Sequence, residues 1–81
     1  ESGKRIVFEI LVQHESMLAN KMVKDISLPE GTLLVEIRRG EYRILPKGNT
    51  KIKEGDTISV LTDVNLECSV KEALEAQNQS T

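Results

Sequence analysis

The side chains that could act as nucleophiles or general bases are few and lie far apart in the sequence. His14 is the only histidine and Cys68 the only cysteine of the 81 residues. A hydrolase triad needs a nucleophile, a base and an orienting acid in one constellation, and no Gly-x-Ser-x-Gly elbow is present. Cys68 also lacks a second cysteine in a CxxC motif. We therefore expect no enzymatic activity, with His14 at a strand end and Cys68 on a helix face.

Metal and nucleotide-cofactor motifs are also missing from the sequence. One histidine and one cysteine cannot build a structural zinc site. Glu54 and Asp56 flank Gly55, an arrangement typical of a turn with positive φ at the glycine, whereas a calcium loop needs further ligands at alternating positions. Neither a Walker A motif nor a dinucleotide fingerprint occurs. We therefore expect neither a metal site nor a cofactor.

The remaining candidate for function is a cluster of positive charge in the middle of the chain. The net charge of the whole chain is −2, and the stretch from Glu54 onwards is acidic. Within positions 38–53, however, a single acid, Glu41, opposes the basic residues Arg38, Arg39, Arg43, Lys47, Lys51 and Lys53. This basic field is either a solvated surface or a site for a small anionic ligand or an acidic partner. The global charge argues against nucleic acid as a partner.

Two of these arginines are expected to face each other across a hairpin. Gly40-Glu41 predicts a two-residue type II′ turn, because glycine suits its first central position. This turn would place Arg38 opposite Arg43, where like charges repel at a cost of about 0.2–1 kcal/mol. A carboxylate from Glu36 or Glu41 would relieve the repulsion. A phosphate would do so too, since guanidinium groups bind phosphate in a bidentate manner.

The same register assigns residues to the two faces of the hairpin. The residues expected to face the core are Leu33, Val35, Ile37 and Ile44. Leu34 and Leu45 are expected on the outer face beside the two arginines. The outer patch would then be partly apolar, as a nucleotide-sized pocket or a dimer seam requires.

The elements that would position this patch follow from hydrophobic periodicity and turn signals. The chain is one small domain with an aliphatic core, since only Phe8 and Tyr42 are aromatic. We predict strands at 5–13, 33–39, 42–45 and 57–61, a helix at 17–25 capped by Ser16, and a second helix that starts with a capping box at 69–72. The fold class is α+β: a small, mostly antiparallel sheet with two short helices, in the order strand-helix-strand-strand-strand-helix. Residues 1–4 are assigned as an appended remnant or linker, 5–76 as a single domain and 77–81 as a frayed tail.

The first predicted strand indicates a partner chain. Residues 6–8 and 10–12 are all apolar, so both faces of this strand are hydrophobic in a domain too small to cover both. We therefore expect a homodimer. The sequence has no run of about 18 apolar residues and no secretory signal, and a single cysteine fits a reducing compartment.

Several turn residues taken together resemble the TrkA-C family, also called the RCK C-terminal domain. The resemblance covers residues 5–62 and rests on three stretches, Pro29–Gly40, Ile44–Ile52 and Gly55–Leu61. The family pattern has a leucine-proline turn, a strand that ends in arginine and glycine, an isoleucine-x-proline, and a glycine-aspartate turn before the last strand. The family usually has glycine-lysine where this chain has Asn20-Lys21, and asparagine also tolerates left-handed geometry.

The resemblance implies a regulatory domain at the cytoplasmic face of the membrane, joined to a membrane-embedded channel or transporter in the same polypeptide and dimerising through this domain. Hosts of the family include potassium uptake channels, cation–proton antiporters and bacterial CLC-type chloride channels, and the turns here are most similar to the chloride-channel tails. Some members bind cyclic di-AMP at the dimer seam. The residues implied here for a cyclic dinucleotide, together with Arg43 of the hairpin, are Leu33, Leu34, Arg38, Arg39, Ile44 and Pro46.

Three functions remain to be compared. The first is a non-enzymatic ligand sensor of an ion channel or transporter, in which a ligand bridges two protomers and favours one dimer geometry. The second is a purely structural dimerisation module. The third is the ligand domain of a transcription regulator, because this family is also fused to such proteins.

Overall fold

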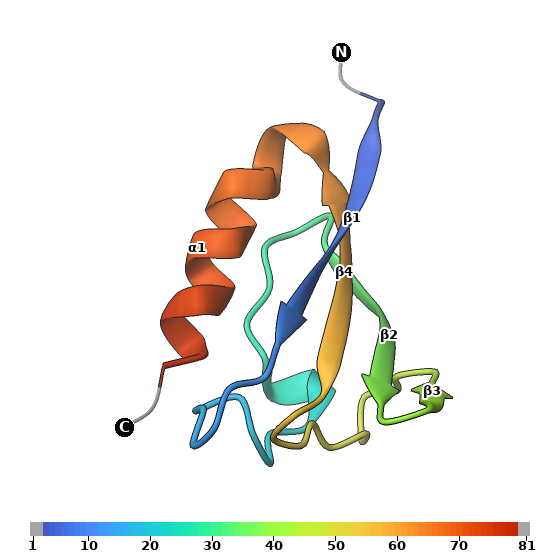
Figure 1. Cartoon of the computed structure of the whole chain (residues 1–81). Coiled ribbons are helices and arrows are strands. Elements are labelled where there is room, and N and C mark those ends of the chain that lie inside the picture. The colour runs from blue at the N-terminus through green and yellow to red at the C-terminus, as the bar shows by residue number, and fades with distance from the viewer. Residues whose placement is uncertain (1–2, 80–81) are drawn as a thin grey trace.

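The computed structural model describes residues 3–79 and places four antiparallel strands in one sheet, with a single α-helix against one side of it (Figure 1). In chain order, the elements are β1 (Arg5–Leu11), the 3-10 helix η1 (Val23–Asp25), β2 (Leu33–Arg39), β3 (Tyr42–Ile44), β4 (Thr57–Asp63), the 3-10 helix η2 (Val64–Leu66) and α1 (Glu67–Gln77). The sheet order is β1-β4-β2-β3. The α+β class and the antiparallel sheet are thus confirmed, and β2 has the predicted bounds. No helix within residues 3–79 combines the length and the apolar composition needed to cross a lipid bilayer.

The core lies between one face of the sheet and α1. Strand alternation directs Phe8 and Ile10 of β1 to this face, together with Ile58 and Val60 of β4, and all four are buried. From the helix, the buried side chains that close the core are Val70 and Leu74. The predicted apolar face of this helix is therefore confirmed. Its predicted start is wrong, since α1 begins at Glu67 directly after η2 and Ser69 lies exposed inside the helix.

A β-bulge in β2 changes the face on which its first residues lie. The pairing of β2 with β4 shifts by one residue between Leu34 and Glu36. An extra residue in one strand reverses the alternation of side chains beyond it. Leu34 therefore packs against the core, while Leu33 is 61% exposed on the other face. The prediction of Leu33 in the core and Leu34 outside was wrong, because it assumed unbroken alternation along the strand.

The helix predicted over 17–25 is reduced to the three residues of η1. The residues before η1 pair instead with the segment 47–52, as in the hydrogen bond that the N–H of Ile52 donates to the carbonyl of Lys21 at 2.9 Å. Asn20 adopts a φ of 70°, the left-handed geometry that interrupts a helix. The apolar spacing did identify Leu18 and Ile26 as buried residues. Tertiary pairing thus outweighs a local helical pattern in this segment.

The residues after α1 are bonded to the start of the domain. The Asn78 side chain is buried, and its Nδ2 donates to the carbonyl of Leu11 at 2.8 Å. Its Oδ1 accepts from the N–H of Gln13 at 3.2 Å and from the hydroxyl of Ser16 at 2.6 Å. The fraying expected for residues 77–79 is therefore not observed. Residues 80–81 of the expected tail and 1–2 of the expected linker lie outside the described residues.

Candidate functional site

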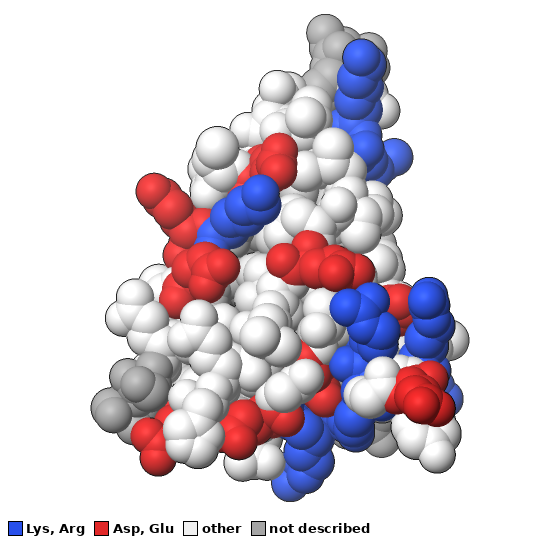
Figure 2. Space-filling model, viewed as in Figure 1, with Lys and Arg blue, Asp and Glu red and all other residues white. Residues whose placement is uncertain are grey.

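The sheet face opposite α1 brings exposed apolar side chains and the predicted arginines together. Val7, Leu11 and Leu33 are all more than half exposed on this face. Leu61 of β4 lies between Val7 and Leu33, opposite both of them in the strand register. Figure 2 shows that basic side chains gather over β2 and β3. We call this surface the open face; it comprises Val7, Glu9, Leu11, Leu33, Glu36, Arg38, Arg43, Thr57, Ser59 and Leu61.

Arg38 and Arg43 lie directly opposite each other, as the hairpin argument predicted. Gly40 adopts a φ of 61°, which the first central residue of a type II′ turn requires. Arg38 Nη1 lies 3.4 Å from Glu9 Oε2, and Arg43 Nη1 lies 3.6 Å from Oε1 of Glu36. Charge-assisted hydrogen bonds of this type are about 2.7–2.9 Å long. Both carboxylates therefore offset the repulsion between the arginines without holding either guanidinium in a short hydrogen bond.

Arg39 differs from these two arginines because its donors are committed within the fold. Its Nε and Nη2 donate to the two carboxylate oxygens of Asp56 at 2.9 and 2.8 Å, and Nη2 also donates to the carbonyl of Lys51 at 3.0 Å. The hydrogen bond from Asp56 raises the pKa of the Arg39 guanidinium above its ordinary value. Asp56 accepts a further hydrogen bond from the N–H of Lys53 at 2.8 Å. Arg39 thus ties the end of β2 to the turn before β4.

The other predicted ligand residues lie beneath or beside the open face. Leu34 and Ile44 are half-buried and pack against the core. Pro46 is half-buried in the turn after β3, and Leu45 beside it is exposed. Leu33, Arg38 and Arg43 are therefore the predicted residues that the structure brings together at the surface of the open face.

Glu9 is a member of this surface that sequence reasoning missed. It lies in β1, which reaches β2 only across β4, so its contact with Arg38 depends on the strand order. Of the two carboxylates local to β2 and β3 that were expected beside the arginines, Glu36 is the one that lies beside Arg43. The one signal in the sequence was that Glu9 interrupts an otherwise apolar strand.

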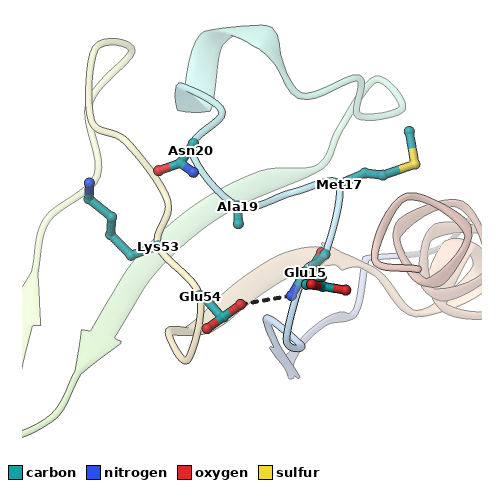
Figure 3. Close-up of a pocket in the computed structure, with 7 residues that line it drawn as sticks. Glu15, Met17, Ala19, Asn20, Lys53 and Glu54 are labelled. Carbon is teal, nitrogen blue, oxygen red and sulfur yellow. Dashed lines mark hydrogen bonds between the residues drawn. The ribbon is translucent and has the colours of Figure 1, made fainter. Parts of the chain in front are cut away.

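A pocket with a volume of about 840 Å³ lies near the end of β1. It is lined by Glu15, Ser16, Met17, Ala19, Asn20, Lys53 and Glu54. The N–H of Glu15 donates to Glu54 Oε2 at 2.7 Å, drawn as a dashed line in Figure 3. This bond and the hydrogen bond with His14 lower the pKa of Glu54. The acidic side chains lie on one side and the Lys53 ammonium on the other (Figure 3), so the pocket has no single charge preference.

The residues first considered for catalysis and metal binding lie in separate parts of the fold, with His14 and Glu54 in contact and Cys68 on α1. His14 is exposed and its Nδ1 lies 2.9 Å from Glu54 Oε2. Cys68 is exposed on α1, as expected for a helix-face residue. Within residues 3–79, no three His, Cys, Asp or Glu side chains form a group that could hold a metal ion.

Comparison with known proteins relates this architecture to a family. A solved structure described as an RCK domain with cda superposes with a TM-score of 0.69 and 21% sequence identity, and the match covers 83% of this chain and 94% of that one. This likeness establishes the fold. In addition, the TrkA-C domain family matches residues 7–67, which is well over half of the chain. The chain therefore belongs to the TrkA-C domain family, which includes regulatory domains of ion-transport proteins.

Proposed function

We propose that this domain is a non-enzymatic regulatory module that senses a small anionic ligand and forms a homodimer. It acts at the cytoplasmic face of a membrane-embedded channel or transporter for chloride, potassium or other cations, as part of the same polypeptide. Membership of the TrkA-C family supports the regulatory role. The observation that carries the ligand-sensing role is the Arg38–Arg43 pair on the open face.

The charge geometry of this pair favours a phosphate-bearing ligand. Arg38 and Arg43 lie opposite each other on adjacent strands, and each guanidinium group has a carboxylate at 3.4–3.6 Å. A phosphate between them would replace these long contacts by short charge-assisted hydrogen bonds and would remove the cross-strand repulsion. Arg39 contributes indirectly, because its donors hold Asp56 and Lys51. Arg38 and Arg43 are therefore the residues we assign to phosphate binding.

A cyclic dinucleotide is the ligand class that fits the rest of the surface. Such a molecule combines phosphates with flat aromatic bases, and the open face carries exposed Leu33 at the start of β2, the strand that also carries Arg38. Leu34 and Ile44 support these strands from the core side, and Pro46 fixes the turn that follows β3. The similar RCK domain solved with cda supports ligand recognition by this fold.

Regulation follows from the difference in affinity between two states of the domain. A ligand shifts a conformational equilibrium only by as much as it binds one state better than the other. Phosphate binding stabilises the hairpin geometry in which Arg38 and Arg43 face each other, because the bound state lacks their repulsion. The host protein then responds to the population of this geometry.

Thermal denaturation with and without nucleotides tests this proposal. Cyclic di-AMP, cyclic di-GMP and ATP are each added at about 100 µM; a ligand with a dissociation constant of 1 µM would stabilise the domain by about 2.7 kcal/mol. In a domain of this size, each kcal/mol of added stability raises the melting temperature by about 4–8 °C. We therefore expect a cyclic dinucleotide to raise the melting temperature by more than about 10 °C. Arg38→Ala and Arg43→Ala should abolish the shift.

The matched control is Lys24→Ala, which removes a positive charge from exposed η1 outside the open face and should keep the full shift. If no nucleotide moves the transition of the wild-type domain, the ligand-sensing proposal fails and the structural dimerisation module becomes the better account.

A further inference from the structure

The outer edge of β1 is the unpaired edge of the sheet on the side away from the hairpin. β1 pairs with β4 alone, as the last strand in the sheet order. The backbone of Val12 bonds towards β4, since its N–H donates to the carbonyl of Asp56 at 2.8 Å and its carbonyl accepts from Gly55 at 2.9 Å. Backbone groups of successive strand residues point to opposite edges. The odd-numbered residues of β1 therefore direct their N–H and C=O groups to the outer edge.

One end of this edge is already closed by a side chain. The Asn78 amide donates to the carbonyl of Leu11 and accepts from the N–H of Gln13, so it replaces a neighbouring strand at these two positions. Figure 1 shows the end of α1 next to the end of β1, where this contact lies. Within residues 3–79, the β1 positions at which neither outward backbone group has such a cover are Arg5, Val7 and Glu9, a run of three positions centred on Val7.

We infer that this edge is an interface between two copies of the chain, in which β1 pairs antiparallel with β1 of a second copy about a two-fold axis at Val7. The inference rests on the proposed homodimer and specifies its surface and register. In this register Val7 faces Val7 of the partner subunit, and Arg5 faces Glu9 of the partner subunit. Each of these directly opposed pairs exchanges two backbone hydrogen bonds.

The charged residues of β1 favour this register over those with the two-fold axis at another position along the strand. Arg5, Val7 and Glu9 all point to the same side of the sheet as the open face, where directly opposed side chains interact. A two-fold axis at Arg5 or at Glu9 would place like charges opposite each other. An axis halfway between Val7 and Glu9 would require the edge carbonyl of Leu11, which already accepts a hydrogen bond from Asn78. Only the axis at Val7 pairs opposite charges on the open face and apolar Ile6 with apolar Phe8 of the partner subunit on the core side.

This dimer connects the interface to the arginine pair through Glu9. Glu9 lies 3.4 Å from Arg38 within its own chain and would lie opposite Arg5 of the partner subunit in the dimer. Arg38 and the partner subunit's Arg5 therefore compete for one carboxylate. An anion that binds Arg38 releases Glu9 to the interface, and by linkage dimer formation favours the anion-binding state of Arg38.

Charge reversal with a mixing control tests the register, with sedimentation equilibrium as the readout. Arg5→Glu places carboxylates opposite Glu9 across the axis, and Glu9→Lys places ammonium groups opposite Arg5. Each variant alone should raise the dimer dissociation constant about ten-fold, because two ion pairs become two repulsions. An equimolar mixture of the two variants restores opposite charges at both positions and should associate within about three-fold of the wild type. Circular dichroism checks that each variant is folded.

The outcomes separate this inference from the proposed function. A wild-type chain that stays monomeric at about 500 µM overturns both the homodimer and the interface. A wild-type dimer that persists in both variants, or a mixture no tighter than its components, overturns the β1 interface alone. Arg38→Ala tests, without any ligand, whether Arg38 and the partner subunit's Arg5 compete for Glu9. This substitution should lower the dimer dissociation constant about two- to three-fold relative to the wild type. An unchanged dissociation constant would refute the connection between Arg38 and the interface.

Discussion

Asp56 is 1% exposed, and both of its carboxylate oxygens accept hydrogen bonds from Arg39, at 2.9 and 2.8 Å. The pair joins the last residue of β2 to the turn that precedes β4. Removing one partner of a buried pair leaves an uncompensated charge, which costs more than the pair contributes while intact. The three arginines of the central basic cluster therefore have different roles, although their side chains are chemically identical.

Arg39→Ala should destabilise the domain by about 2 kcal/mol, because it leaves the Asp56 carboxylate buried with only the Lys53 N–H as a charge-stabilising donor. The melting temperature of the variant should fall by about 10 °C. Arg38→Ala is the matched control, since it removes a half-buried arginine that has one long contact and should change stability by less than about 0.5 kcal/mol. Equal losses in the two variants would contradict the structural role of Arg39.

Gly55→Ala should lower the free energy of unfolding by about 1 kcal/mol or more, through its effect on the backbone alone. Gly55 adopts a φ of 88°, and no atom lies within 4 Å of the position where a Cβ would be added. The loss of stability would therefore come from the left-handed backbone conformation at Gly55 and not from a steric clash. Gly48→Ala is the control, because Gly48 has no positive φ and an added Cβ would meet Lys24 Cβ at an ordinary 3.6 Å. Chemical denaturation of both variants measures the difference.

The parts of the fold that depend on local rules could be predicted from the sequence. Type II′ turn chemistry fixed the register of Arg38 and Arg43, and a glycine-aspartate turn predicted the positive φ at Gly55. The burial of Val70 and Leu74 followed from helical spacing. These features depend on residues within a few positions of one another, where sequence spacing determines geometry.

The parts that could not be predicted depend on contacts between distant segments. The bulge in β2 depends on how β4 pairs with it, and it exchanged the faces of Leu33 and Leu34. The segment before η1 forms backbone hydrogen bonds with residues 47–52 instead of the hydrogen bonds of a helix. The contact between Glu9 and Arg38 spans three strands in the sheet order, which no local pattern in the sequence encodes.

Asn78→Ala should destabilise the domain by about 2 kcal/mol, although the substitution lies just after the last helix. It removes the amide that serves Leu11, Gln13 and Ser16 and leaves their polar groups without this partner. Asn78→Asp keeps the accepting oxygen but loses the Nδ2 donor to Leu11, so it should also destabilise the domain. Gln79→Ala, at an exposed neighbouring position, should have little effect. Unaltered unfolding of the Asn78→Ala variant would show that the tail is not part of the folded unit.

The hydrogen bonds at Glu54 predict a dependence of stability on acid pH. The N–H of Glu15 and, second, the His14 side chain lower the pKa of Glu54 in the folded protein. A carboxyl whose folded pKa lies below its unfolded value of about 4.3 adds stability above pH about 4.3. That stability is lost as the pH falls through the folded pKa. Glu54→Gln removes the titrating group. The melting temperature of the wild type should therefore exceed that of the variant at pH 6, and the difference should shrink steadily below pH about 4.

Glu30→Gln, at an exposed glutamate in the turn before β2, is the control and should give no such trend. A wild-type advantage that stays constant from pH 6 to pH 3 would mean that the Glu54 carboxylate does not stabilise the fold through its charge.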